Sequence, residues 1–87
     1  MPEKPPFNLI FAPKAQKTLE KMDATIAALL VEGLKIFAKT GLPRPKPLVG
    51  KFKGAHRLRF GDLRAVIVMD GKTVNVLDVG ARDKIYK

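Results

Sequence analysis

The sequence predicts a small α+β domain, with two helices packed on one face of a small antiparallel sheet. Three observations carry this prediction. Apolar residues recur at helical spacing over residues 13–41. Three short apolar runs follow, separated by Gly-Asp and Asp-Gly pairs that favour two-residue hairpin turns. A short aromatic and β-branched run precedes the helices, so the expected order is β-α-α-β-β-β.

The N-terminal half is expected to hold one strand and two helices. Residues 7–11, FNLIF, predict the strand. Pro13 suits the first turn of a helix, and Asp23 can cap a second one. Gly41 favours the end of that second helix, and the LPRPKP segment at 42–47 predicts a stiff extended connector.

The second helix is apolar over more than one stripe. The expected buried face is Ile26, Leu29, Leu30, Gly33, Leu34 and Phe37. Ala27, Ala28 and Val31 widen the apolar surface beyond that face. Two interpretations remain open: the first helix covers these residues, or they form a patch for a partner helix.

The C-terminal half is expected to form three strands, at His56–Phe60, 63–69 and 73–79. A two-residue hairpin through Gly61-Asp62 would pair the first two. The register of the third is open. A two-residue turn at Asp70-Gly71 would point Val74 and Val76 at the core and Leu77 and Val79 at the other face, and a three-residue turn would reverse this.

Strand alternation separates apolar from basic side chains in this hairpin. The expected core face carries Leu58, Phe60, Leu63, Ala65, Ile67 and Met69, and the other face carries Arg57, Arg59, Arg64, Val66 and Val68. Arg59 then lies directly opposite Arg64, and opposed like charges cost up to about 1 kcal/mol. A bound anion would offset that cost, and the arginine fork matches phosphate. The alternative is a solvated basic surface, although Lys51 and Lys53 add charge nearby.

Composition supports a polyanion as the partner. The 87 residues suit one domain, spanning 1–87 with a proline-rich loose tail at 1–6, and the net charge is +9. Such a surplus attracts RNA or DNA first, then an acidic protein or an anionic membrane. There is no cysteine and only one histidine, which disfavours disulfides, metal sites and metal cofactors. No apolar stretch suits a signal peptide or a membrane span, so a soluble cytoplasmic protein is expected.

Four segments in order resemble one known family. They are FxxxAxKxLEKM from Phe11, GKFKG at 50–54, HRLRFGDLR at 56–64 and VGARDKIY at 79–86. Together they resemble the RelE/ParE superfamily of bacterial and archaeal type II toxins. The resemblance implies a β-α-α-β-β-β fold without a cofactor. It also implies a RelE-like branch whose members enter the ribosomal A site and cut messenger RNA.

The resemblance also implies a site. Carried over by motif, its catalytic residues would be Arg57, Arg59, Arg64, Arg82 and Tyr86. Lys51, Lys53 and His56 lie close to these residues in the sequence and are expected to bind substrate. The arginines would stabilise charge while the 2′-hydroxyl attacks the phosphate. Tyr86 would stack on a base, whereas its own sequence context also suits a tail residue packed on the sheet.

This chain departs from the family pattern where a proton acceptor is needed. Arg59 stands where some members have lysine, and Ala81 replaces a histidine or lysine. Arginine stays protonated. His56 is the nearest ordinary base, but alternation points it away from the arginines, and it equally suits a strand-end histidine. Cleavage would then rest on charge stabilisation and positioning by the ribosome, which is consistent with weak activity.

Two alternatives remain beside the nuclease. One is a ParE-like toxin that inhibits DNA gyrase without cutting RNA, and the other is an inactive RNA-binding relic. The arginine set argues against the first and the missing base argues for it. The toxin readings imply a cognate antitoxin protein that wraps the chain, and the nuclease reading adds the ribosome and messenger RNA.

Overall fold

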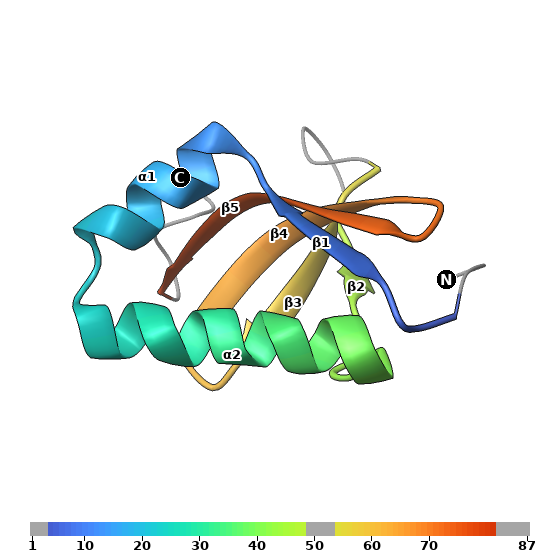
Figure 1. Ribbon diagram of the computed structural model, residues 1–87, viewed down its shortest axis with the longest axis horizontal. Coiled ribbons are helices and arrows are strands. Elements are labelled where there is room, and N and C mark those ends of the chain that lie inside the picture. The colour runs from blue at the N-terminus through green and yellow to red at the C-terminus, as the bar shows by residue number, and fades with distance from the viewer. Residues whose placement is uncertain (1–3, 49–53, 82–87) are drawn as a thin grey trace.

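The computed structural model describes residues 4–48 and 54–81, which form a five-stranded sheet with two helices on one face (Figure 1). The elements are β1 (Asn8–Phe11), α1 (Pro13–Lys21), α2 (Ala24–Thr40), β2 (Lys46–Pro47), β3 (His56–Phe60), β4 (Leu63–Asp70) and β5 (Thr73–Ala81). The strands lie in the order β1-β5-β4-β3-β2. The α+β class and the predicted order of the main elements are confirmed, with β2 as a short addition.

The sheet is mixed and not wholly antiparallel as expected. β1 pairs in parallel with β5, with Asn8 beside Thr73 and Phe11 beside Val76. A hairpin turn forces antiparallel pairing only on the two strands that it joins, and no turn joins β1 to β5. β2 arises because Lys46 and Pro47, within the extended connector, pair with the edge of β3.

The core lies between the helices and one face of the sheet. Its fully buried side chains include Leu30, Leu34 and Phe37 of α2, Leu58 of β3, Ala65 and Ile67 of β4, and Val74, Val76 and Val79 of β5. Phe7 stacks on Phe37 with ring centroids 5.6 Å apart. Phe60, Leu63 and Met69 pack at the edge of this cluster. The predicted core face of the hairpin is therefore confirmed.

Local signals set the ends of α2. The Asp23 carboxylate accepts hydrogen bonds from the backbone N–H of Thr25 (3.0 Å) and Ile26 (3.2 Å). Gly41 ends the helix in the left-handed conformation with φ of 77°. Both predicted caps are confirmed.

The buried face of α2 is narrower than expected. Ile26 and Leu29, predicted to be buried, are 37% and 59% exposed. One sheet face contacts only one stripe of a helix, and Leu30, Leu34 and Phe37 fill that stripe. In the predicted Ala27, Ala28 and Val31 patch, only Ala28 is exposed, and the other two are half-buried.

A bulge decides the register of β5. Gly71 and Lys72 form the turn, because Asp70 pairs with Thr73. Val66 lies opposite Asp78 while Ile67 lies opposite Val76, so Leu77 is the extra residue. Because of the extra residue, the side chain of Val79 points toward the core again, and Val79 is buried there with Val74 and Val76. The expectation that these three valines would divide between the faces is wrong.

The expected tail at 1–6 lies partly outside the described residues. Within the described part, the Pro5 ring lies beside Gly41, about 3.5 Å from the Cβ position that a side chain at 41 would occupy. In the described ranges, neither helix combines the length and apolarity that a membrane crossing needs.

Candidate functional site

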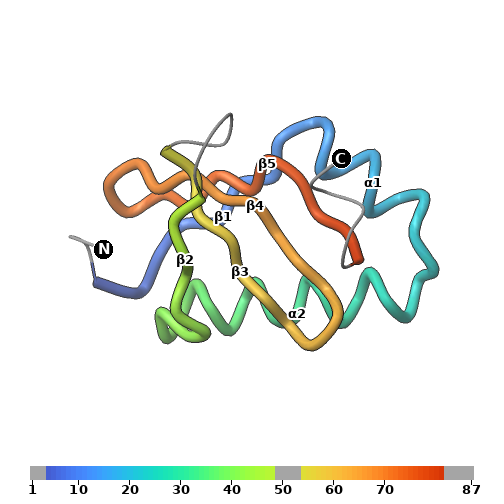
Figure 2. The backbone as a smooth tube through the Cα atoms, turned by 180° about the vertical axis from the view of Figure 1, so that it is seen from behind, coloured from blue at the N-terminus to red at the C-terminus, as the bar shows by residue number. Residues whose placement is uncertain are grey.

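Figure 2 shows the molecule from the side of the sheet opposite α2. The pairing of β3 with β4 places the basic side chains of the hairpin on this side. Arg59 lies directly opposite Arg64, and Arg57 lies opposite Val66, so the predicted register is confirmed. On the next strand, Gly80 lies opposite Arg64. The three arginines therefore lie on one face, as strand alternation predicted.

A small apolar cluster supports this face at the β2 end. Ala55 and Val66 are buried in it, and Leu48 and Val68 pack against them. The backbone N–H of Leu48 also donates to the Ala55 carbonyl over 3.0 Å. The cluster therefore fixes the end of the connector against β3 and β4.

The guanidinium groups differ in their contacts. Arg59 Nε donates a hydrogen bond to the Gly61 carbonyl over 3.2 Å, which holds that side chain beside the hairpin turn. Arg57 Nε is buried and has no hydrogen-bond partner in the described part of the chain. A buried donor without a partner costs free energy, so an acceptor that reaches Arg57 would be stabilising.

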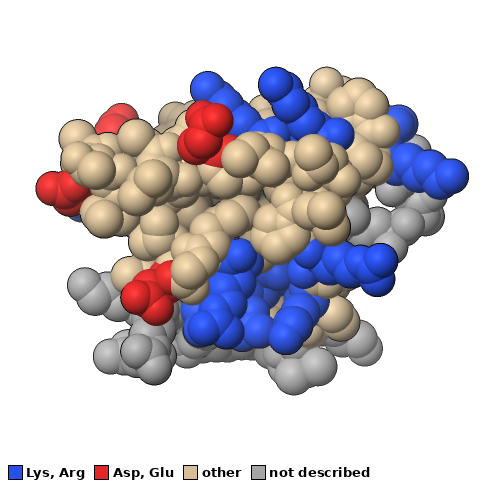
Figure 3. All heavy atoms as spheres, turned by 90° about the horizontal axis from the view of Figure 1, so that it is seen from below, with Lys and Arg blue, Asp and Glu red and all other residues tan. Residues whose placement is uncertain are grey.

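A cleft of about 320 Å³ opens between the connector and this hairpin. It is lined by Pro43, Arg44, Lys46, Arg57, Arg59 and Gly61, with no carboxylate among them. Figure 3 shows Lys and Arg side chains gathered into a patch in the lower part of the view. We call the residues Arg44, Lys46, Arg57 and Arg59 the basic cleft. Its four cationic side chains favour an anionic ligand.

Sequence analysis did not single out Arg44 and Lys46. The signal for them was present, because residues two apart in an extended segment point to the same side. Lys46 lies directly opposite Arg57 on β3, which places a second like-charge pair on the face. Only the pairing of β2 with β3 shows that the connector and hairpin share one site.

His56 lies apart from the arginines. It pairs with Pro47 and Ile67, which places it on the opposite side of β3 from Arg57. There it lines a hollow of about 500 Å³ with Thr40, Pro47 and Arg44, and Arg44 also lines the basic cleft. Its Nδ1 is buried with no hydrogen-bond partner among residues 4–48 and 54–81. The other predicted site residues, Lys51, Lys53, Arg82 and Tyr86, lie outside the described residues.

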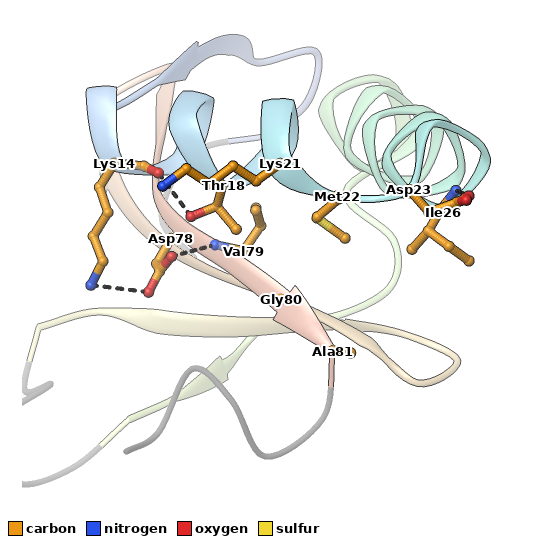
Figure 4. A pocket seen from close by; sticks show the side chains of 10 residues that line it. All are labelled: Lys14, Thr18, Lys21, Met22, Asp23, Ile26, Asp78, Val79, Gly80 and Ala81. Atoms are coloured by element: carbon orange, nitrogen blue, oxygen red, sulfur yellow. Dashed lines mark hydrogen bonds and ion pairs between the residues drawn. The ribbon is translucent and has the colours of Figure 1, made fainter.

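A third hollow, of about 540 Å³, lies between α1, the start of α2 and the end of β5 (Figure 4). Lys14 Nζ and an Asp78 carboxylate oxygen form an ion pair of 3.2 Å there. The other Asp78 oxygen accepts from the Val79 N–H over 2.9 Å. Its charges are mixed and partly paired, so this hollow is less suited to a polyanion than the basic cleft.

Solved structures with the same fold were found, whereas no family model and no curated protein sequence matches the chain. The RelBE2 toxin–antitoxin complex from Mycobacterium tuberculosis is similar with a TM-score of 0.80 and 28% identity, covering 90% of this chain and 93% of that one. The archaeal RelE–RelB complex from Pyrococcus horikoshii has a TM-score of 0.71 at 19% identity, covering 91% and 98%. The isolated RelE toxin of E. coli has a TM-score of 0.68 at 22% identity, covering 92% and 90%.

The fold is that of RelE-type toxins, and the 28% identity to the RelBE2 complex supports the RelE-like toxin superfamily. The sequence resemblance and the fold therefore agree. Neighbours at the lower identities support the fold alone.

The basic face of this RelE-like chain has a defined chemical capacity. Arginine and lysine side chains bind phosphate and can stabilise charge that develops on its oxygens. The described residues that line the basic cleft include arginine and lysine but no histidine and no carboxylate. The described residues also include no group of three or more His, Cys, Asp or Glu side chains suited to a metal ion.

Proposed function

We propose that this chain is the toxin of a type II toxin–antitoxin pair and acts as a ribosome-dependent endoribonuclease on messenger RNA. The observation that carries the proposal is the opposed pair Arg59 and Arg64, beside Arg57, on a RelE-like fold. Directly opposed like charges cost folding free energy, and a bound phosphate would offset that cost.

In the proposed reaction the 2′-hydroxyl of the RNA attacks the adjacent phosphorus. The bond to the 5′-oxygen breaks, which leaves a 2′,3′-cyclic phosphate and a 5′-oxygen that takes a proton from water to become a 5′-hydroxyl. Arg57 and Arg64 stabilise the charge that grows on the phosphoryl oxygens. Arg59 holds the RNA strand beside the hairpin turn of the protein. By resemblance, Arg82 adds to the charge stabilisation and Tyr86 stacks on a base, while Lys51 and Lys53 contact phosphates.

Proton transfer is the weak step of this proposal. The hydroxyl proton needs an acceptor, and the described residues that line the basic cleft offer guanidinium and ammonium groups, which are proton donors. Asp78 lies opposite Val66 on the same face of the sheet, but its carboxylate forms an ion pair with Lys14. His56 lies on the other side of β3. We therefore propose that water accepts the proton and that the ribosome positions the substrate, which predicts slow turnover.

Primer extension on messenger RNA in a purified translation system tests this function. Wild-type protein should produce cuts at the A-site codon. Arg64→Ala should lower the cleavage rate by about 100-fold or more, as loss of a transition-state charge donor does. Lys35→Ala, which removes an equal charge from exposed α2, should cut like wild type. Absence of cuts with active ribosomes, or equal cutting by Arg64→Ala, would contradict the nuclease.

A gyrase-inhibiting toxin is the second candidate, favoured by the absence of a proton acceptor among the described residues that line the basic cleft. Such a protein would bind its target without cutting RNA. A DNA supercoiling assay with the same purified protein separates the two, since inhibition of gyrase without messenger RNA cuts supports the second candidate.

We also propose a cognate antitoxin as partner. The similar structures include complexes whose names pair a RelE-type toxin with its antitoxin. Ile26, Leu29 and Ile36 of α2 are exposed apolar side chains on a strongly basic chain. A segment that is both acidic and amphipathic would complement that surface.

A further inference from the structure

We propose that Arg44 and Lys46 of the connector form a second phosphate subsite, next to the phosphate that the hairpin arginines hold. This inference rests on the proposed function, since it assigns RNA as the ligand. It adds two binding residues from a segment that the resemblance does not include. Their role is to bind the RNA backbone and not to take part in the reaction.

The connector presents both side chains to the same cleft. Lys46 lies directly opposite Arg57, and directly opposed residues point to the same side of a sheet. Arg44 lines the same cleft two residues earlier. Both residues are exposed, so an RNA strand can reach them.

Proline makes the connector rigid enough to serve as a binding surface. Pro43, Pro45 and Pro47 alternate with the two basic residues, and each proline ring fixes its own φ. The connector is further held by the pairing of Pro47 with His56 and by the Leu48 N–H donating to the Ala55 carbonyl. A preorganised site loses less conformational entropy when its ligand binds.

Among the described residues, no acidic side chain compensates the charges of the basic cleft. None of its lining residues is acidic, and the one ion pair found among the described residues joins Lys14 to Asp78 in a different hollow. Arg57 Nε is a buried donor without a described acceptor. A phosphodiester supplies both the missing negative charge and the missing acceptor oxygens.

The basic cleft is continuous with the proposed reaction site. Arg57 and Arg59 line the cleft, and Arg59 also lies opposite Arg64 on β4. An RNA strand that contacts Arg64, then β3, then Lys46 would cross the sheet from β4 to β2. Successive phosphates would then meet the hairpin first and the connector second. The alternative is that Arg44 and Lys46 act only through the overall positive field of the molecule.

Salt-dependent binding separates these possibilities. The probe is a labelled single-stranded RNA whose 2′-hydroxyls are methylated, so that it cannot be cut, and binding is followed by fluorescence anisotropy at several NaCl concentrations. The test protein carries Arg44→Gln and Lys46→Gln. The matched control carries Lys35→Gln and Lys39→Gln, which remove the same charge from exposed positions of α2.

The subsite predicts a specific loss. The plot of log affinity against log salt concentration has a negative slope. In the test protein this slope should be less steep by about 1.4, which corresponds to two lost phosphate contacts at about 0.7 each for single strands. Affinity at low salt should fall by about tenfold, and the control should stay within about twofold of wild type. Equal losses in both double variants, or no binding of the RNA by wild type, would overturn the subsite.

Cleavage on ribosomes distinguishes this inference from the proposed function. The test protein should have a higher KM than wild type and nearly the same kcat, whereas Arg64→Ala should have a lower kcat. If wild type makes no cuts but the binding difference persists, the nuclease fails and the subsite stands. If wild type cuts and the test protein matches the control in both assays, the subsite alone fails. Urea midpoints of both double variants near wild type show that the fold is retained.

Discussion

Two pairs of like charges face each other across neighbouring strands, Arg59 with Arg64 and Lys46 with Arg57. Each pair opposes folding, because opposed like charges repel at the short spacing of a cross-strand pair. Arg57 also costs folding free energy because its Nε is buried without a hydrogen-bond partner among the described residues. At the residue scale, the basic cleft is therefore a place where stability and binding are in conflict.

Lys46→Glu tests this conflict directly. The substitution turns a repulsive cross-strand pair into an attractive one with Arg57, so we expect the free energy of unfolding to rise by about 0.5–1 kcal/mol at low salt. Urea unfolding measures it. Lys46→Gln should give an intermediate value, and RNA affinity should fall in both variants. A loss of stability in Lys46→Glu would show that Lys46 and Arg57 do not repel each other.

At the element scale, the contact between α2 and the β3–β4 hairpin sets how closely the helix approaches the sheet. A Cβ atom at Gly33 would lie 2.7 Å from Cδ1 of the Phe60 ring. A real Cβ does not approach so closely, so the helix presents glycine where the ring of the last β3 residue packs. This packing fixes the hairpin that carries the arginines.

Gly33→Ala is expected to lower the free energy of unfolding by about 1 kcal/mol. Crowding against the Phe60 ring costs roughly 1–3 kcal/mol, while alanine gains about 1 kcal/mol of helix propensity over glycine. In a Phe60→Ala background the crowding disappears, and the same substitution should be stabilising. Urea unfolding of the four proteins closes the cycle. Equal effects in both backgrounds would show that the ring does not limit the approach.

At the scale of the whole molecule, the net charge of +9 opposes compaction. Across residues 4–48 and 54–81, the single ion pair found is that of Lys14 with Asp78. The excess of basic over acidic side chains makes repulsion between them oppose folding. Salt shortens the range of that repulsion.

We therefore expect the free energy of unfolding to rise by about 1 kcal/mol between 20 and 200 mM NaCl, a range over which the screening length falls from roughly 20 Å to under 10 Å. Urea unfolding at each salt concentration checks it. Lys46→Glu lowers the net charge by two, from +9 to +7, and should show a smaller rise. Stability that falls with salt would mean that attractive pairs dominate.

The sequence by itself determined features that depend on neighbours in the chain. Asp23 and Gly41 end α2 as predicted, since a cap acts on backbone groups within a few residues. The Gly61-Asp62 turn and the period of two placed Arg59 opposite Arg64 for the same reason. The roles proposed for Lys51, Lys53, Arg82 and Tyr86 remain predictions, because these residues lie outside the described ranges.

Only the tertiary structure decided what depends on segments far apart in the chain. It set the parallel pairing of β1 with β5, the bulge at Leu77 that returns Val79 to the core, and the position of Arg44 and Lys46 beside the hairpin. No local rule fixes these, because the free energy that selects them comes from packing between elements that no turn connects. The arginines of the hairpin could therefore be found by reading the chain, whereas the connector's part of the cleft required the fold.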